Sequence, residues 1–413
     1  MILRARIVLP VSQPPVENGA IAVSENKILA IGPWEDLKSD SDEKVFDLGE
    51  VVLLPGLVNA HCHLDYTDMA GQLSPPKTFT DWIPLIMGAK SAWTYSDYAR
   101  SWLNGAKMLL RTGTTTVGDI EAVPDLLPEI WDAAPLRVVS FLEMTGIRSQ
   151  RAAKDILSET IEKIDSHSHE LSRAALSPHA PYSTSPELLK LTAESARRRK
   201  LRVATHIAES HDEFEMFTNA RGKMFDWLAR SHRDNSDCGL GSPVQHAARA
   251  GLLGENFLAI HVNLLARGDA ALLRKTGAHV VHCPRSHEYF RHPPFQRERL
   301  TNAGVNIALG TDSLATTRKA GKQKPELNMF AEMRALSVAG KKISPVEILK
   351  MATVNGARAL GMAGQTGELS KNAFADLIAI PFAGKTSEVH EAVLHHEGNV
   401  AASMIDGRWA FQG

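Results

Sequence analysis

The middle of the sequence alternates between short runs rich in β-branched residues and longer amphipathic stretches, and this alternation limits the fold more than any other feature. Eight of the short runs are predicted strands, at residues 51–59, 114–119, 137–143, 173–177, 202–206, 257–261, 279–283 and 305–311. The stretches between them carry helix signals, such as the Ser185-Pro186 start and the Ser344-x-x-Glu347 capping box. Eight strand–helix units in series predict an α/β fold with a parallel (β/α)8 TIM barrel. A doubly wound sheet is the alternative that strand counting leaves open.

The two ends of the chain have a different pattern, in which short apolar strands are separated by tight turns. Strand candidates occupy residues 21–23, 27–31, 45–48 and 51–54 near one end, and 375–380, 400–405 and 408–410 near the other. We therefore predict a small β-sandwich domain that is composed of residues 1–54 and 363–413. The barrel then forms a separate catalytic domain of residues 55–362.

Charge and cysteine content exclude several classes of protein. The 413 residues include 46 Lys and Arg and 47 Asp and Glu, which gives a net charge of −1, so we expect no nucleic-acid partner and no membrane partner. The first residues lack the apolar segment of a secretory signal, and three cysteines indicate reduced thiols in a cytoplasmic protein. The expected partner is a small-molecule substrate, and formation of a homo-oligomer is left open.

Histidine is abundant, with 17 residues, and several polar side chains stand where predicted strands end. His61 and His63 follow the first strand, His206 and His261 end the fifth and sixth, and Asp312 follows the eighth. Because the carboxyl ends of barrel strands meet at one mouth, we expect these side chains to lie together. Such a group is costly to bury unless its members share an ion or hydrogen bonds.

The His61-x-His63 spacing places both imidazoles on the same face of an extended strand, so that both point at one ion. His167 and His169 have the same spacing, but they lie in a polar segment with no strand before them, and we interpret them as surface residues. Three histidine nitrogens and one carboxylate oxygen suit Zn²⁺, and also Fe²⁺ or Mn²⁺. Such an ion lowers the pKa of bound water to about 7, and Glu209 is the candidate proton carrier beside it.

Five segments together resemble the amidohydrolase superfamily, and most closely its cytosine deaminase, chlorohydrolase and S-adenosylhomocysteine deaminase branch. They are PGLVNAHCHLD from residue 55, SPHAPYSTSPELL from 177, VATHIAES from 203, LAIHVN from 258 and IALGTDS from 307. The segments occur in the family's order and cover nearly the whole chain, including the divided terminal domain. The resemblance implies a metal-dependent hydrolase.

The resemblance also implies a role for each matching residue. One divalent metal, with zinc expected first, is implied at four ligands: His61, His63, His206 and Asp312. One metal is expected rather than two, because residues 174–177 contain no lysine that matches the carbamylated lysine of two-metal relatives. In this family His261 would hydrogen-bond the attacking water or the reacting centre, Glu209 would protonate a ring nitrogen, and His179 would contact substrate.

Two segments depart from the branch at the expected substrate pocket. HCPRSH from residue 282 stands where the branch often has H-N-P-x-S-N, and ATTR from residue 315 replaces a Ser-Asn pair. Arg148 and Arg285 are candidate contacts for an anionic substrate tail. An aminopurine nucleoside that carries a carboxylate, such as S-adenosylhomocysteine or aminodeoxyfutalosine, fits this description.

The prediction from sequence is therefore a deaminase that releases ammonia from an amino-substituted heterocycle. In it, metal-bound hydroxide attacks the carbon that bears the amino group, Asp312 relays the proton of the water, and Glu209 protonates the neighbouring ring nitrogen. The alternatives are a hydrolytic dechlorinase or N-dealkylase of triazine-like rings at the same site, a non-catalytic scaffold, and a metal-storage protein.

Overall fold

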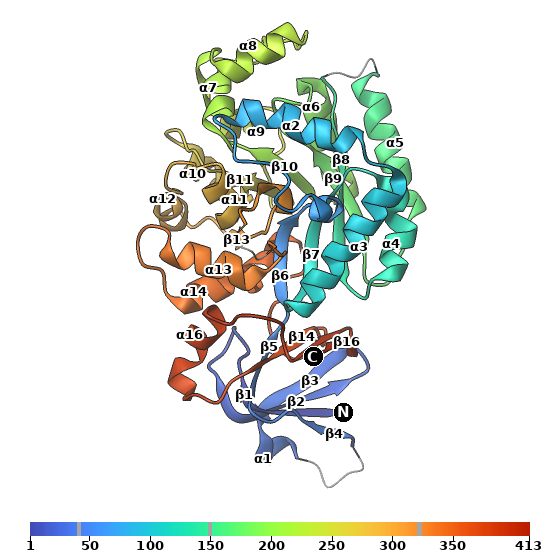
Figure 1. Cartoon of the computed structure of the whole chain (residues 1–413), viewed down its shortest axis with the longest axis vertical. Coiled ribbons are helices and arrows are strands. Elements are labelled where there is room, and N and C mark those ends of the chain that lie inside the picture. The colour runs from blue at the N-terminus through green and yellow to red at the C-terminus, as the bar shows by residue number, and fades with distance from the viewer. Residues whose placement is uncertain (39–42, 148–150, 320–323) are drawn as a thin grey trace.

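The computed structural model describes residues 1–413 except 39–42, 148–150 and 320–323, and it contains two sheets in separate parts of the chain. Figure 1 shows a larger body of strands surrounded by helices, and a smaller β-rich body that contains both ends of the chain. The larger body has eight parallel strands, hydrogen-bonded in chain order: β6 (Leu57–Cys62), β7 (Thr114–Glu121), β8 (Arg137–Met144), β9 (Arg173–Pro178), β10 (Val203–Ile207), β11 (Phe257–His261), β12 (His279–His282) and β13 (Ile307–Leu309).

The eight strands close into a barrel where the first strand meets the last. The backbone amides of Thr311 and Asp312 donate to the carbonyl of His61 at 3.0 and 3.1 Å. Gly310 makes this approach possible, because a Cβ at this position would stand 2.7 Å from the same carbonyl oxygen. The closure confirms the predicted barrel and excludes a doubly wound sheet, whose edge strands stay apart.

Helices follow the strands along the chain and cover the outside of the barrel (Figure 1). They are α2 (Phe79–Ser91), α3 (Tyr95–Arg111), α4 (Leu127–Ala133), α5 (Ala153–Ser166), α6 (Pro186–Arg199), α7 (His211–Asn219), α8 (Lys223–Arg230), α9 (Pro243–Arg249), α10 (Asp269–Thr276), α11 (Pro284–Tyr289), α12 (Arg297–Asn302), α13 (Met329–Val338), α14 (Pro345–Met351) and α15 (Val354–Ala359). Both predicted helix starts are confirmed, since the Ser185 hydroxyl accepts from the Leu188 amide and Ser344 forms a capping box with Glu347.

The smaller body is one continuous mixed sheet built from strands of both ends. Its order is β16 (Arg408–Gln412), β15 (Ala402–Ile405), β14 (Leu377–Pro381), β5 (Val51–Pro55), β1 (Ile2–Val8), β2 (Val16–Ser24) and β3 (Lys27–Pro33), with β4 (Val45–Asp47) beside β1. Two short helices, α1 (Trp34–Leu37) and α16 (Val389–Leu394), belong to the same terminal segments. The predicted fold class, with a separate β-rich part built from both termini, is thus confirmed.

The strand predicted over residues 51–59 is wrong as a single strand, because the chain passes there from one sheet to the other. β5 pairs with β1 and β14 in the terminal sheet, whereas β6 begins the barrel. Gly56 separates them: its amide donates to the Asp376 carbonyl at 3.1 Å, and a Cβ there would lie 2.0 Å from Thr115 Oγ1. The apolar run continues through this change of sheet, so hydrophobicity alone gives no sign of it.

No helix within the described residues combines the length and the apolar character that crossing a bilayer requires.

Candidate metal centre and active site

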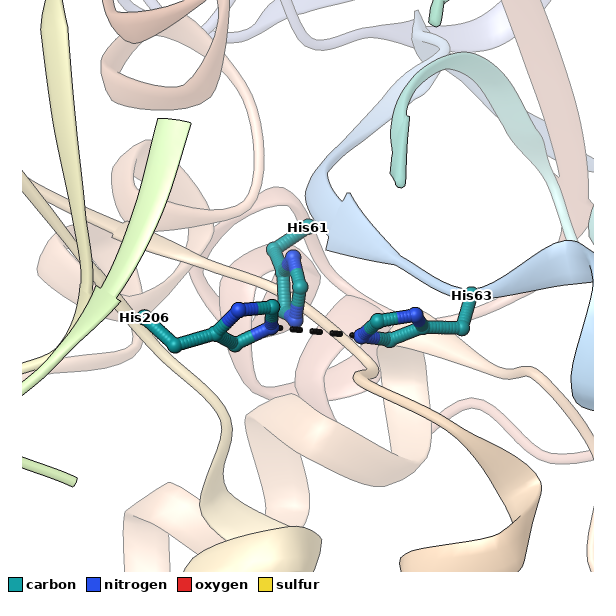
Figure 2. A group of neighbouring side chains, drawn as sticks. All are labelled: His61, His63 and His206. Atoms are coloured by element: carbon teal, nitrogen blue, oxygen red, sulfur yellow. Dashed lines mark hydrogen bonds between the residues drawn. The ribbon is translucent and has the colours of Figure 1, made fainter. Parts of the chain in front are cut away.

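Three histidines converge at the mouth of the barrel. His61 lies on β6, His63 directly follows it, and His206 lies on β10; Figure 2 shows their rings pointing toward one another. Nε2 of His63 lies 3.2 Å from Nε2 of His206, and each of the three rings offers one nitrogen within 4.8 Å of the others. Burial, reinforced by neighbouring histidines, lowers the pKa of His63 and of His206 well below the usual value, so both present neutral nitrogens.

Asp312 brings a carboxylate to the same point from the end of β13, next to β6. Its Oδ1 lies 3.5 Å from Nε2 of His61 and 3.7 Å from Nε2 of His63. The other oxygen, Oδ2, accepts hydrogen bonds from the hydroxyls of Ser286 at 2.5 Å and Thr316 at 3.2 Å. Burial raises the pKa of Asp312, but contact with His61 and nearby histidines lowers it more, so this carboxyl is ionised.

The donor set fits a divalent metal. Neither ring nitrogen of His61 has a hydrogen-bond partner among the described residues, although this side chain is only 1% exposed. An unpaired buried imidazole is costly, and a cation shared with the neighbouring donors would remove that cost. Histidine nitrogens and carboxylate oxygens are common ligands of zinc. His261, His61 and Asp312 also each offer one possible ligand atom within 4.8 Å of the others. His261 is therefore a possible metal ligand as well.

His179 orients one of these ligands. It follows β9, and its backbone carbonyl accepts a hydrogen bond from Nδ1 of His206 at 2.9 Å. This bond fixes the proton of His206 on Nδ1 and leaves Nε2 free to face the centre. The ring of His179 itself is held by the hydroxyl of Ser183 at 2.5 Å and lies 3.8 Å from a carboxylate oxygen of Glu143.

Glu209 and His261 lie side by side next to the ligands, with 3.5 Å between Oε1 of Glu209 and Nε2 of His261. Burial, together with the charges of Asp312 and Glu213, raises the pKa of Glu209 well above its ordinary value. Burial lowers the pKa of His261 to about 3. Burial thus favours the protonated form of Glu209 and the neutral form of His261, which is an arrangement for proton donation.

A cavity of about 320 Å³ opens over these residues. Its floor is polar and consists of His63, His206, Glu209, His261 and Asp312. Its wall is largely apolar and comes mainly from α2, with Phe79, Trp82, Ile83, Ile86 and Met87. The cavity thus combines a polar floor with a largely apolar wall, as small-molecule binding sites usually do.

The two predicted arginine contacts have different outcomes. The guanidinium of Arg285 donates to Glu332 and to the carbonyl of Glu326, and Arg285 is not among the described residues that line the cavity. Arg148 lies outside the described residues, but Ile147 before it lines the cavity.

Sequence reasoning missed two ionisable residues of the cavity, Glu143 and Lys90. Glu143 lies at the end of β8, so the argument from strand ends that located the histidines applies to it as well. Lys90 comes from α2, and its Nζ lies 4.7 Å from the ring centroid of Tyr66. No pattern in the sequence shows that α2 folds over the barrel mouth, so Lys90 had no detectable signal.

Residues 52–410 match the amidohydrolase family. The chain belongs to this family. A curated relative from Syntrophobacter fumaroxidans, named 5-methylthioadenosine/S-adenosylhomocysteine deaminase, is 32% identical over 407 residues, which cover 91% of this amidohydrolase and 87% of the relative. The predicted resemblance is confirmed.

Solved structures support the fold of this amidohydrolase. The aminofutalosine deaminase of Helicobacter pylori in complex with methylthio-coformycin has a TM-score of 0.86 at 22% identity and covers 99% of both chains. An adenosine deaminase from Xanthomonas campestris with bound zinc has a TM-score of 0.84 at 23% identity and covers 99% of this chain and 92% of that one. At these identities the similarity establishes the architecture alone.

Proposed function

We propose that this amidohydrolase deaminates an aminopurine nucleoside of the 5′-methylthioadenosine and S-adenosylhomocysteine type, and releases ammonia. The observation that carries the proposal is the buried carboxyl of Glu209, which lies 3.5 Å from His261 on the floor of the cavity, beside the proposed metal ligands, and whose pKa is raised by burial. Deamination of an aromatic ring needs a proton donor at this place, because attack on the ring carbon develops negative charge on the neighbouring nitrogen. The name of the relative at 32% identity supports the same substrate class.

His61, His63, His206 and Asp312 are the proposed ligands of one divalent metal, for which zinc suits the donors best. When bound, such an ion supplies Lewis acidity that makes water acidic enough to be a nucleophile near neutral pH.

The proton transfers and the hydrogen bonding in the reaction are assigned to three residues of the chain. Glu209 donates its proton to the ring nitrogen next to the attacked carbon, which removes the charge that develops there. Asp312 is ionised and accepts a proton from the attacking water. That proton passes to the departing amino group, and the carbon–nitrogen bond breaks to release ammonia. The new hydroxyl on the attacked carbon returns its proton to Glu209, and a carbonyl remains. His261 hydrogen-bonds the attacked centre.

For the tail of the substrate we propose contacts from His179, Arg148 and Lys90. His179 and Lys90 line the cavity, and Arg148 follows the lining residue Ile147. The guanidinium of Arg285, in contrast, is already paired with Glu332, so a direct contact of Arg285 with the tail requires that this pair opens.

The test is an ammonia-release screen of the zinc-loaded protein. The panel contains 5′-methylthioadenosine, S-adenosylhomocysteine, adenosine, aminodeoxyfutalosine, cytosine and a chlorinated triazine, and chloride is measured beside ammonia. We expect ammonia from the adenine nucleosides with a 5′ substituent, and metal that co-purifies with the protein. Chloride release without ammonia would support the dechlorinase instead, and a stable metal-free chain without any turnover would support the scaffold.

A further inference from the structure

We propose that Glu213 is a positioning residue that holds Glu209 in the place from which it donates its proton; this inference rests on the proposed function. Glu213 lies in the first turn of α7 and is completely buried. Its Oε1 accepts a hydrogen bond from the amide of Ala208 at 3.1 Å, and its Oε2 accepts one from the amide of Glu209 at 2.8 Å. One carboxylate thus occupies both amides of the segment that carries the proton donor.

That segment needs such support because its backbone is strained. Ala208 has a φ of +50°, in the left-handed region that side chains other than glycine rarely adopt. Such a conformation persists only where its surroundings determine it. The side chain of Asn263 holds the other side by donating to the Glu209 carbonyl at 2.9 Å. The Ser210 hydroxyl accepts from the Glu213 amide at 3.1 Å and fixes the start of the helix.

A role in helix capping alone does not account for this geometry. In a capping box the third helical residue reaches back to the amide of the capping residue, which is Ser210 here. Glu213 reaches one and two residues further back, to the strained turn. In the described part of the chain it has no lysine, arginine or histidine within salt-bridge distance, and burial raises its pKa to about 7 in spite of the amides that it accepts. A buried carboxylate without a counter-ion is costly, and both oxygens of Glu213 accept from the amides of this turn, so its role lies in the segment that it holds.

The decisive variant is Glu213→Gln, because glutamine has the same shape but only one acceptor oxygen, and its NH2 group would face the second amide. The zinc-loaded enzyme is assayed at pH 8, above the pKa of about 7 of the wild-type side chain. We expect kcat to fall by about 10- to 100-fold, since small misplacements of a catalytic group have effects of this size. The KM and the metal content should stay close to those of the wild type.

Asp269→Asn is the matched control. Asp269 is also completely buried, and its oxygens accept from the amide of Ala266 at 2.7 Å and from the hydroxyl of Ser242 at 2.8 Å, away from the cavity. We expect this variant to lose stability without losing kcat. If Glu213→Gln does not fold, Glu213→Asp replaces it, because aspartate keeps both oxygens but is one methylene too short to reach both amides. Wild-type kcat in Glu213→Asp would overturn the proposal.

Two further measurements separate positioning from general stability. In the double variant Glu209→Gln, Glu213→Gln, we expect the kcat of Glu209→Gln alone, because no proton donor is left to position. If the loss of kcat in the double variant equals the product of the losses in the two single variants, the proposal is wrong. Amide hydrogen exchange needs no substrate, and it should be faster at residues 208–210 in Glu213→Gln than in the wild type and in Asp269→Asn. Unchanged exchange would reject positioning even if deamination is established, while faster exchange without any deamination would count against the proposed function alone.

Discussion

At the scale of single residues, the site combines groups whose environments drive their pKa values in opposite directions. Burial raises the pKa of Glu209 and lowers that of His261, although the two side chains are 3.5 Å apart. As a result the pKa of the carboxyl lies above that of the imidazole, which is the reverse of their usual order in water. Opposite shifts in neighbouring groups are a typical mark of acid–base catalysis.

The first prediction concerns the proton donor. Glu209→Gln keeps the size of the side chain but cannot give up a proton, so we expect turnover to fall by at least ~10²-fold, the usual scale of general acid catalysis. The metal content, measured by elemental analysis, should be unchanged, because Glu209 is not among the proposed ligands. Near-normal turnover would show that another group donates the proton.

A second residue-level prediction concerns stability and pH. His279 is buried at the start of β12, donates from Nε2 to the Glu255 carbonyl at 3.2 Å, and accepts from the side chain of Asn306 at 3.1 Å. Burial, followed by the charges of Arg202 and Arg358, lowers its pKa to about 4 from 6.5. The unfolded chain therefore takes up a proton here below pH 6.5 and the folded chain does not. The stabilisation from a neutral His279 is complete above pH 6.5 and is lost as the pH falls toward 4.

This effect can be isolated by comparing the wild type with His279→Gln in urea unfolding at pH 7.5 and pH 5. The difference in unfolding free energy between the two proteins should move in favour of the variant by about 1.4 kcal/mol for each pH unit below 6.5, the value of one pKa unit. A difference that does not change with pH would contradict the assignment of a neutral His279.

The positions of the site residues were largely predictable, because each stands at the end of a strand. His61, His206 and His261 come from strands that are far apart in sequence, and the barrel alone brings them together. The partners that orient them were not predictable. Whether Arg285 faces the cavity or pairs with Glu332 depends on how α11 packs against α13, and no local pattern encodes that contact.

At the scale of elements, α2 covers the site, and its start is attached to α7, the helix that follows the segment of Glu209. α2 supplies most of the apolar wall of the cavity, and α7 begins at His211, two residues after Glu209. The two helices are joined where they start, since a carboxylate oxygen of Asp212 accepts from the amide of Thr80 at 2.9 Å and from its hydroxyl at 2.6 Å. The position of α2, which covers the cavity, is thereby coupled to the segment that carries the proton donor Glu209.

The prediction at this scale is that Asp212→Ala loosens the cover without removing any group that touches substrate. We expect KM to rise by about 10-fold, on the order of one or two lost hydrogen bonds to a charged acceptor, while kcat changes little. Lys223→Gln is the control, because it breaks an exposed ion pair between α8 and Asp81 of the same cover, and such pairs contribute little. Equal KM values for Asp212→Ala and Lys223→Gln would contradict a role of the contact between α2 and α7 in substrate binding.

Element boundaries show where prediction from sequence ends. The strand periodicity indicated eight barrel strands and the β-rich termini, and both are present. The predicted domain boundary lies between residues 54 and 55, but residues 51–59 were also counted as one barrel strand, because the residues on both sides of Gly56 are equally apolar and buried. Only the close packing of Thr115 and the bond to the Asp376 carbonyl, which come from distant parts of the chain, show that the sheet changes there.

At the scale of the whole molecule, a buried ion pair joins the barrel to the terminal sheet. Arg137, at the start of β8, donates from Nε to Asp376 at 2.8 Å and from Nη2 to Asp406 at 3.1 Å. Its side chain is 5% exposed, and that of Asp376 is 1% exposed. This contact lies at the end of the barrel away from the cavity, because β8 begins at Arg137 and ends beside the site.

Arg137→Leu should therefore lower stability by about 3–5 kcal/mol, because two carboxylates lose their buried counter-ion. Urea unfolding measures the loss, and kcat of the folded fraction should be unchanged. Arg4→Gln serves as comparison, since it breaks an exposed pair with Asp47 inside the terminal sheet and should cost about 1 kcal/mol or less. A small loss in Arg137→Leu would show that the two bodies do not depend on this contact.

The place of β5 between β1 and β14 also affects how the protein can be made. During translation β5 (residues 51–55) is synthesised early, but its second neighbour in the sheet, β14 (residues 377–381), is synthesised more than 300 residues later. Throughout that interval the nascent chain has an unpaired strand edge, and such edges readily associate with other chains. Fragments from translation that stops before residue 377 should therefore be prone to aggregation. The sheet of the terminal body cannot be completed until the whole barrel has been synthesised.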